Sequence, residues 1–274
     1  MKTTTWGVVS GAWVALALTA SAAPAQSLER RVAGAPDGTV RFSYAARPGV
    51  YGNGRNSISW GCQNGRCRSR QVDGNYSDWD SDDWTSACDS GPVRIALRVQ
   101  GGAVTDLRTY VGGEWRPSPG TRVTDLGTVA AREAATYLLG LAAKDSSRAS
   151  ERAVFPATLA DSVTIWPDLL RLARADRISR KVRRSAVFWL GQAAGDAATR
   201  GLTDLVDEAS MDHEVRETAV FALSQRPREE GVPALIRIAK ENRDPDLRRK
   251  ALFWLGQSDD PRALALFEEL LTRP

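Results

Sequence analysis

The sequence predicts an α+β protein whose two kinds of structure lie in separate domains. A small, mainly antiparallel β domain is expected over residues 39–116, and an α–α superhelix, or solenoid, over residues 129–274. One helical pattern recurs four times in the second region, which is the signature of a repeat architecture. The first region is dense in Gly, Asn, Ser, Trp and Tyr and shows no helical period.

Residues 1–25 have the features of a signal peptide. Lys2 provides a short basic start, residues 8–20 are apolar, and Ala-Pro-Ala at 23–25 supplies the small residues of a cleavage site. The apolar stretch is shorter than the roughly 20 residues that span a bilayer. We therefore expect cleavage before Gln26, no integral membrane span afterwards, and a periplasmic or secreted protein of 274 − 25 = 249 residues.

The clearest β element is a hairpin. Residues 93–99 alternate apolar and polar side chains, Gly101 and Gly102 follow, and residues 104–111 form the second strand. Residues 39–44 are expected to form a third strand. Residues 115–120, which include two prolines, are interpreted as the linker into the helices.

Three cysteines lie in the N-terminal half: Cys62, Cys67 and Cys88. An oxidising compartment favours a disulfide between two of them. Cys62 with Cys67 would close a small loop and Cys62 with Cys88 a longer one, and the sequence leaves both open. Zinc requires four ligands, and because the only histidine, His213, is distant in sequence, no zinc site is predicted.

The helical repeat is carried by segments 153–157, 186–190, 219–223 and 251–255. Their first alanines are 33, 33 and 32 residues apart (186 − 153, 219 − 186 and 251 − 219), and four of the six phenylalanines share one register. These are Phe155, Phe188, Phe221 and Phe253. Each copy reads as two helices, and because such a pair cannot bury its own apolar surface, neighbouring copies must stack.

Prolines mark the expected limits of several helices. Pro167 and Pro233 are predicted to begin second helices, where a missing N–H is tolerated. Pro156 is expected to interrupt its helix and so to distort the first copy. A further helix at 130–144 is predicted to cap the solenoid.

The segments Asp-His-Glu-Val-Arg at 212–216 and Asp-Pro-Asp-Leu-Arg at 244–248 resemble the HEAT-repeat family, particularly the short HEAT-like repeats of phycobilisome lyases. The resemblance covers residues 129–274. It implies that turn aspartates and helix arginines form a ladder between repeats. The corresponding positions are Asp212, Asp244, Arg183, Arg216 and Arg248.

We predict no catalytic residues, no resident metal and no cofactor. One HEAT-like enzyme, deoxyhypusine hydroxylase, holds two irons with several His-Glu pairs, whereas this chain has only His213-Glu214. A single histidine also removes the usual base for a Ser or Cys nucleophile. Four aspartates match a calcium loop weakly, because Asp83 stands where the loop needs glycine. They are Asp78, Asp80, Asp82 and Asp89.

The charge pattern favours a protein partner. The formal net charge is only +4, and because basic and acidic residues are interspersed, nucleic acid is not expected. Trp79 and Trp84 are candidate recognition residues because charges flank them, whereas Trp60 is expected to fill a core. Further candidates are the polar residues of the second helices, which line the inner curve in the resembling family. They are Arg171, Arg174, Asp204, Asp207, Arg237 and Lys240.

Two functional hypotheses follow. The first is an exported scaffold or adaptor that binds a partner protein through the solenoid surface. The alternative is a ligand-binding or enzymatic protein whose site lies in the β domain, around the acidic and aromatic loop.

Overall fold

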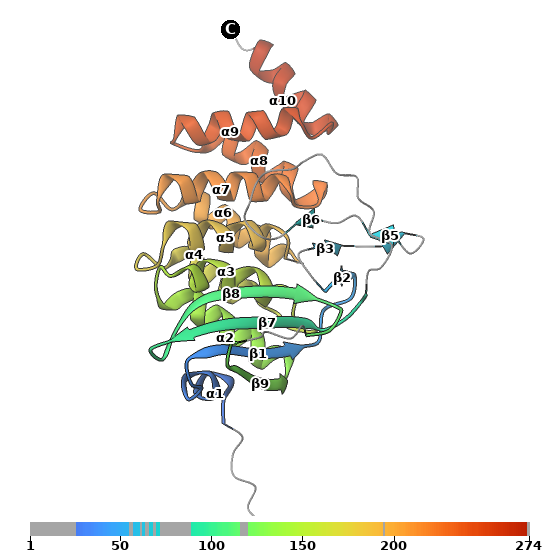
Figure 1. The fold of residues 1–274 in the computed structure, drawn as a ribbon. Helices are drawn as coiled ribbons and strands as arrows, with labels where there is room; N and C mark the ends of the chain where they lie inside the picture. Colours follow the sequence, from blue (N-terminus) through green and yellow to red (C-terminus); the bar gives the residue numbers. More distant parts are fainter. Residues whose placement is uncertain are drawn as a thin grey trace, which may run out of the picture.

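The computed structural model describes residues 26–54, 57–60, 62–63, 66–67, 70–71, 89–115, 120–193 and 195–272. A four-stranded sheet packs against the first helices, and paired helices are stacked from there toward the C-terminus (Figure 1). Within these ranges no helix is both long enough and apolar enough to cross a membrane.

The four-stranded sheet has the order β8-β7-β1-β9. The predicted hairpin is confirmed: β7 (Val93–Gln100) pairs antiparallel with β8 (Ala103–Val111). Gly101 and Gly102 form its turn at φ values of 58° and 73°, which glycine adopts without a steric penalty. The predicted third strand is β1 (Gly38–Tyr44), antiparallel to β7.

The chain returns to the sheet after the segment that we interpreted as a linker. Strand β9 (Val123–Thr128) pairs parallel with β1, so sheet residues continue past 116. None of its six residues is buried. The strand therefore lacks the apolar alternation by which a strand is recognised in sequence.

One face of the sheet packs on helices α1 (Leu28–Ala33), α2 (Ala131–Lys144) and α3 (Arg148–Ala157). Phe42 meets Tyr137 edge to face with ring centres 6.1 Å apart. The Tyr44 hydroxyl donates to the carbonyl oxygen of Pro156 at 2.6 Å, and burial raises the pKa of that hydroxyl. The sheet and the first helices thus share one core. Helix α1 is not in the sequence prediction.

Short strands precede the hairpin. Strands β2 (Val50–Gly52), β3 (Ser57–Trp60) and β6 (Arg70–Gln71) form one sheet, and β4 (Cys62–Gln63) pairs with β5 (Arg66–Cys67). Their backbone sets Cys62 opposite Cys67. Asp89 is exposed and pairs through its backbone with Gly52. The following predicted features lie outside the described residues: the side chains of Cys62, Cys67 and Trp60, and all of Cys88, Trp79, Trp84, Asp78, Asp80, Asp82 and Asp83.

The solenoid consists of four helical pairs. The first helices are α3, α5 (Arg180–Gly191), α7 (His213–Ser224) and α9 (Pro245–Gly256). The second helices are α4 (Trp166–Arg174), α6 (Asp196–Asp207), α8 (Arg228–Glu241) and α10 (Pro261–Thr272). Each first helix packs against the next, and the repeated alanines Ala186, Ala219 and Ala251 are fully buried. The predicted α-solenoid is therefore present.

The four phenylalanines of the repeat lie in one aromatic row. Phe155 contacts Trp189 at 5.2 Å between ring centres, Phe188 stacks on Phe221 at 6.3 Å, and Phe221 meets Trp254 at 5.0 Å. Phe253 extends the row by contacting Trp254. One sequence register thus corresponds to one row of aromatic contacts, at whose end Phe253 is 58% exposed.

Two proline expectations need correction. Helix α8 begins at Arg228, so Pro233 lies inside it rather than at its start. Pro233 and Glu229 are both exposed, so water can bond the Glu229 carbonyl that loses its helical donor. Pro156 does not interrupt α3, which ends one residue later at Ala157. Pro167 falls in the first turn of α4, as expected.

Candidate functional site

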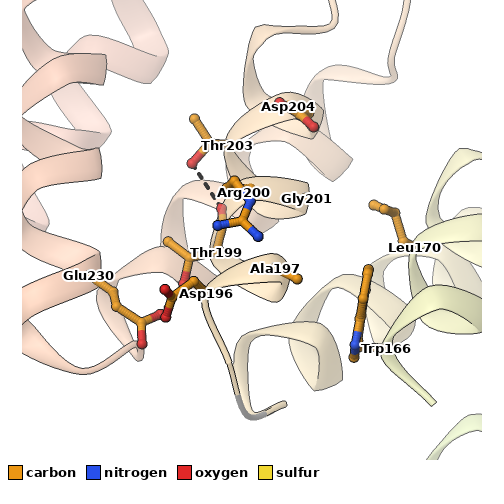
Figure 2. Close-up of a pocket in the computed structure, with 10 residues that line it drawn as sticks. All are labelled: Trp166, Leu170, Asp196, Ala197, Thr199, Arg200, Gly201, Thr203, Asp204 and Glu230. Carbon is orange, nitrogen blue, oxygen red and sulfur yellow. Dashed lines mark hydrogen bonds between the residues drawn. The ribbon is translucent and has the colours of Figure 1, made fainter. Parts of the chain in front are cut away.

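The neighbouring second helices α4, α6 and α8 enclose an open hollow of about 530 Å³. Figure 2 shows α6 between Trp166 and Leu170 of α4 on one side and Glu230 of α8 on the other. The lining residues are Trp166, Leu170, Asp196, Ala197, Thr199, Arg200, Gly201, Thr203, Asp204 and Glu230.

Small residues of α6 form the floor of the hollow. These residues are Ala197 and Gly201. A Cβ atom at Gly201 would lie 3.2 Å from a methyl carbon of Leu170. Glycine therefore permits the close approach of α6 to α4. The same small residues leave the Trp166 side chain as an apolar wall.

The rim of the hollow is acidic. Asp196 and Asp204 are exposed, and neither carboxylate has a hydrogen bond or ion pair with another described residue. The same holds for the Arg200 guanidinium. Glu230 is paired with Arg226, so the unpaired charges of the lining are two carboxylates and one guanidinium, a formal charge of 1 − 2 = −1. An aromatic wall beside free carboxylates suits a cation that carries an apolar stem.

Arg226 fixes one edge of the hollow. Its buried guanidinium donates to the Thr199 hydroxyl at 2.8 Å and pairs with Glu230 at 2.8 Å. It also donates to the carbonyl oxygens of Gly191, Ala193 and Gly195 in the α5–α6 turn. Hydrogen bonds from Thr199 and then Arg226 hold the pKa of Glu230 below its usual value.

The sequence contains one signal for Arg226, which the repeat motifs do not include. The corresponding positions of two other copies are Ala193 and Ser258, which directly follow the shared Gly-Gln segment. An arginine at a position otherwise occupied by small residues indicates a local contact. Thr199, Glu230 and Trp166 carry no comparable signal.

Most of the charged residues predicted on the second helices form ion pairs within the solenoid. Three ion pairs join adjacent repeats: Arg174 with Glu208 at 3.3 Å, Arg237 with Asp207 at 2.8 Å, and Lys240 with Glu269 at 2.6 Å. Arg171 pairs with Asp168 of its own helix at 2.6 Å. Of the six predicted residues only Asp204 lines the hollow. Their role in partner binding stays a prediction.

The residues proposed for the repeat ladder lie along the starts of the first helices. Arg183 is 3.7 Å from Asp212, and Arg216 is 3.3 Å from Asp244 of the next repeat. Arg180 contacts Asp212 more closely, at 3.0 Å. Arg248 instead donates to the carbonyl oxygens of Asn242 and Arg243, at 2.8 and 3.2 Å.

Both ladder aspartates also cap helices. Asp212 accepts from the Glu214 N–H at 3.1 Å, and Asp244 accepts from the Asp246 N–H at 3.0 Å. Burial raises the pKa of Asp212, but Arg180 and the backbone donors outweigh it, so the net pKa is lowered. The pKa of Asp244 is lowered in the same way.

His213 is the first residue of α7, with its side chain 47% exposed. Its Nδ1 lies 3.3 Å from an Asp244 carboxylate oxygen. In the part of the chain that the structure describes, no three His, Cys, Asp or Glu residues are grouped as a metal site would require.

A family model described as HEAT repeats matches residues 199–274, which contain most of α6 and all of α7 to α10. No curated protein matches the chain. The chain therefore carries HEAT repeats in its C-terminal part, and such repeats are protein-interaction modules.

Proposed function

We propose that this protein is an exported scaffold that holds a partner protein on the surface of its second helices. The observation that carries the proposal is the hollow between α4 and α8. Asp196 and Asp204 line the same hollow as Trp166 and have no ion pair with a described residue, whereas the charges predicted around them are mostly neutralised within the solenoid. Free carboxylates next to an aromatic wall are available to a ligand.

The partner group that fits the hollow is a lysine or arginine side chain. Its methylene stem packs along Trp166 and Leu170, and its cationic end meets one carboxylate, that of Asp196 or that of Asp204, because the two residues are about 12 Å apart along α6. Aromatic and charged anchors of this kind supply most of the binding energy of many protein interfaces. The ion-paired residues on either side then form a polar rim.

Photo-cross-linking tests this role. A photoreactive amino acid replaces Arg200 at the hollow or Arg184 on a first helix, both of which are exposed. In cells, an adduct of defined mass is expected from position 200 only. The double variant Asp196→Asn with Asp204→Asn should abolish it.

A matched control removes the same charge elsewhere. Glu241→Gln with Glu268→Gln changes two exposed carboxylates on α8 and α10, and this variant should keep the adduct. The scaffold role is refuted if the same adduct forms from both labelled positions, or if the Asp variant leaves it unchanged.

Export is the second part of the proposal and rests on the pattern of residues 1–25. The mature protein recovered from the periplasm or medium should begin near Gln26 by mass spectrometry. An intact N-terminus on cytoplasmic protein would contradict this part alone.

The alternative function, with a site in the acidic and aromatic loop of the β domain, concerns residues 72–88, outside the described residues. We therefore advance one function.

A further inference from the structure

We infer that a cavity between the β1–β2 loop and the first repeat binds a carboxylate that is carried on a flat apolar group. The cavity has a volume of about 220 Å³. Since one water molecule occupies about 30 Å³ of liquid, this is the space of about seven waters, which fits one side chain or one small organic acid. The site goes beyond the scaffold function, because of the residues that line the acidic hollow only Trp166 also lines this cavity.

Backbone contacts hold two walls of the cavity together. The Arg47 N–H, in the β1–β2 loop, donates to the carbonyl oxygen of Leu159, in the α3–α4 loop, at 2.8 Å. Next to this bond, Ala46 and Ala160 form an antiparallel bridge. These contacts fix the backbone of Arg47 relative to the α3–α4 loop, so a ligand would lose little free energy in ordering the two loops.

Arg47 is the only charged residue among the described residues that line the cavity. It is half-buried, and its guanidinium has no hydrogen bond or ion pair with another described residue. Burial lowers the pKa of the Arg47 guanidinium, because the protein replaces part of the water that solvates its charge. The group stays charged at neutral pH, so a bound anion would offset the lost solvation.

The positive end of a helix dipole lies in the same lining. Ile165 and Trp166, at which α4 begins, both line the cavity, and Ile165 provides no side-chain cap. Asp168 in the first turn of α4 pairs with Arg171 at 2.6 Å, so its own charge is balanced. Helix N-termini favour anions. Two separate features therefore make this cavity electropositive, in contrast to the acidic hollow.

Other walls of the cavity are apolar and aromatic. Trp166 and Trp189 contribute indole rings, and Val163 contributes a branched aliphatic side chain. Phe155 packs on Trp189 with ring centres 5.2 Å apart, which restricts the position of that indole. Because flat rings pack well against indoles, these walls favour a ligand with a planar apolar group.

The polar groups of the lining match a carboxylate. One guanidinium balances its single charge through paired, charge-assisted hydrogen bonds. Thr164 and Gln192 add further donors, and neither side chain bonds another described residue. A free aromatic acid and the C-terminal aromatic residue of a polypeptide both present this chemistry. The experiment must therefore distinguish these two sources.

The test uses the purified protein and four probes in isothermal titration calorimetry. Phenylacetate is compared with phenylacetamide, which has nearly the same shape but no charge, and the peptide acetyl-Gly-Gly-Phe is compared with its C-terminal amide. We expect phenylacetate to bind with a Kd of about 1 mM or below. Phenylacetamide should bind at least about tenfold more weakly, because a hydrogen bond to a charged group contributes about that factor.

A matched pair of variants tests the role of the cation. Arg47→Met removes the guanidinium and keeps a long side chain, and it should weaken phenylacetate binding by at least about tenfold. The control Arg177→Met removes an exposed arginine between α4 and α5 and should bind like the parent.

A third variant tests the cavity itself. Val163→Phe fills the space while keeping Arg47, and it should abolish binding of phenylacetate and of the peptide acid. Val163 is only half-buried, so the circular dichroism spectrum should not change. A folded Val163→Phe protein that binds phenylacetate like the parent would overturn the inference.

The pattern of binding identifies the source of the carboxylate. Heat from phenylacetate but not from the peptide acid, lost in Arg47→Met only, supports a free aromatic acid. Heat from the peptide acid, again lost in Arg47→Met only, supports the C-terminus of a polypeptide. The site is refuted by equal affinity for phenylacetate and phenylacetamide, by equal loss in both arginine variants, or by no heat with any probe.

Discussion

Replacing Arg226 by methionine should weaken the interface between the two middle repeats. Methionine has a similar length but cannot donate to Thr199, Glu230 or the three carbonyl oxygens of the α5–α6 turn. The Gly191 carbonyl belongs to a buried residue, and leaving such an acceptor unpaired costs about 1–3 kcal/mol. Loss of the guanidinium partner of Glu230, a carboxylate 23% exposed, adds to that cost.

We therefore expect Arg226→Met to lower the free energy of unfolding by about 3 kcal/mol, which is at the lower end for breaking a buried ion pair. For a chain of this size that corresponds to a fall in Tm of about 6–12 °C. Arg237→Met is the matched control. It breaks an ion pair of the same length, 2.8 Å, whose side chains are 40% and 44% exposed. Its cost should stay below about 1 kcal/mol.

Thermal unfolding followed by circular dichroism at 222 nm measures the difference between the two variants. Because repeat stability resides in contacts between neighbours, hydrogen exchange should also accelerate selectively in α6. Equal Tm values for the two methionine variants would refute the view that Arg226 fastens these repeats.

Two further predictions concern stability. Gly191→Ala should destabilise the protein by about 1–3 kcal/mol, since its Cβ would lie 2.9 Å from the Ala222 Cβ. Gly256→Ala, at the equivalent position with its nearest contact at 3.9 Å, should stabilise by up to about 1 kcal/mol; the order of the two Tm values checks both. Hydrogen bonds from Arg262 lower the pKa of Asp260 from 3.8 to about 2. The stabilisation that ionised Asp260 gains from Arg262 is therefore present above pH 3.8 and is lost as the pH falls toward 2. Because Asp260→Asn lacks this titrating group, its Tm should fall less than that of the parent protein between pH 5 and 2.

Repetition explains how far the sequence predicts the solenoid. Phenylalanine is rare in this chain, and Phe188 and Phe221 are 33 residues apart, at the spacing of the repeat. That spacing predicts the stacking of neighbouring repeats, in which the two rings are in contact. Strand β9 gives no such signal, because it joins β1 through its backbone and buries none of its side chains. Pairing in a sheet depends on backbone hydrogen bonds that every residue type except proline can donate.

The hollow depends on departures from the repeat, which is why periodicity does not predict it. Gly201 and Ala197 have small side chains and so leave space on one face of α6. Arg226 occupies a turn position that holds a small residue in other copies of the repeat. The second-helix positions were identifiable as polar, but whether a carboxylate such as Asp207 or Asp204 is paired depends on the next repeat. Sequence spacing alone does not contain that information.

The proposed function assigns partner binding to charges other than those that stabilise the same surface. Arg226, Thr199 and Glu230 bond to one another and set the position of α6 relative to α8. Asp196 and Asp204 add no contact to this network and project from the helix that it positions. Because the edge of the hollow is already fixed, a ligand would lose little free energy in ordering it. Neutralising the aspartates should therefore remove binding at constant Tm, whereas Arg226→Met should lower both together.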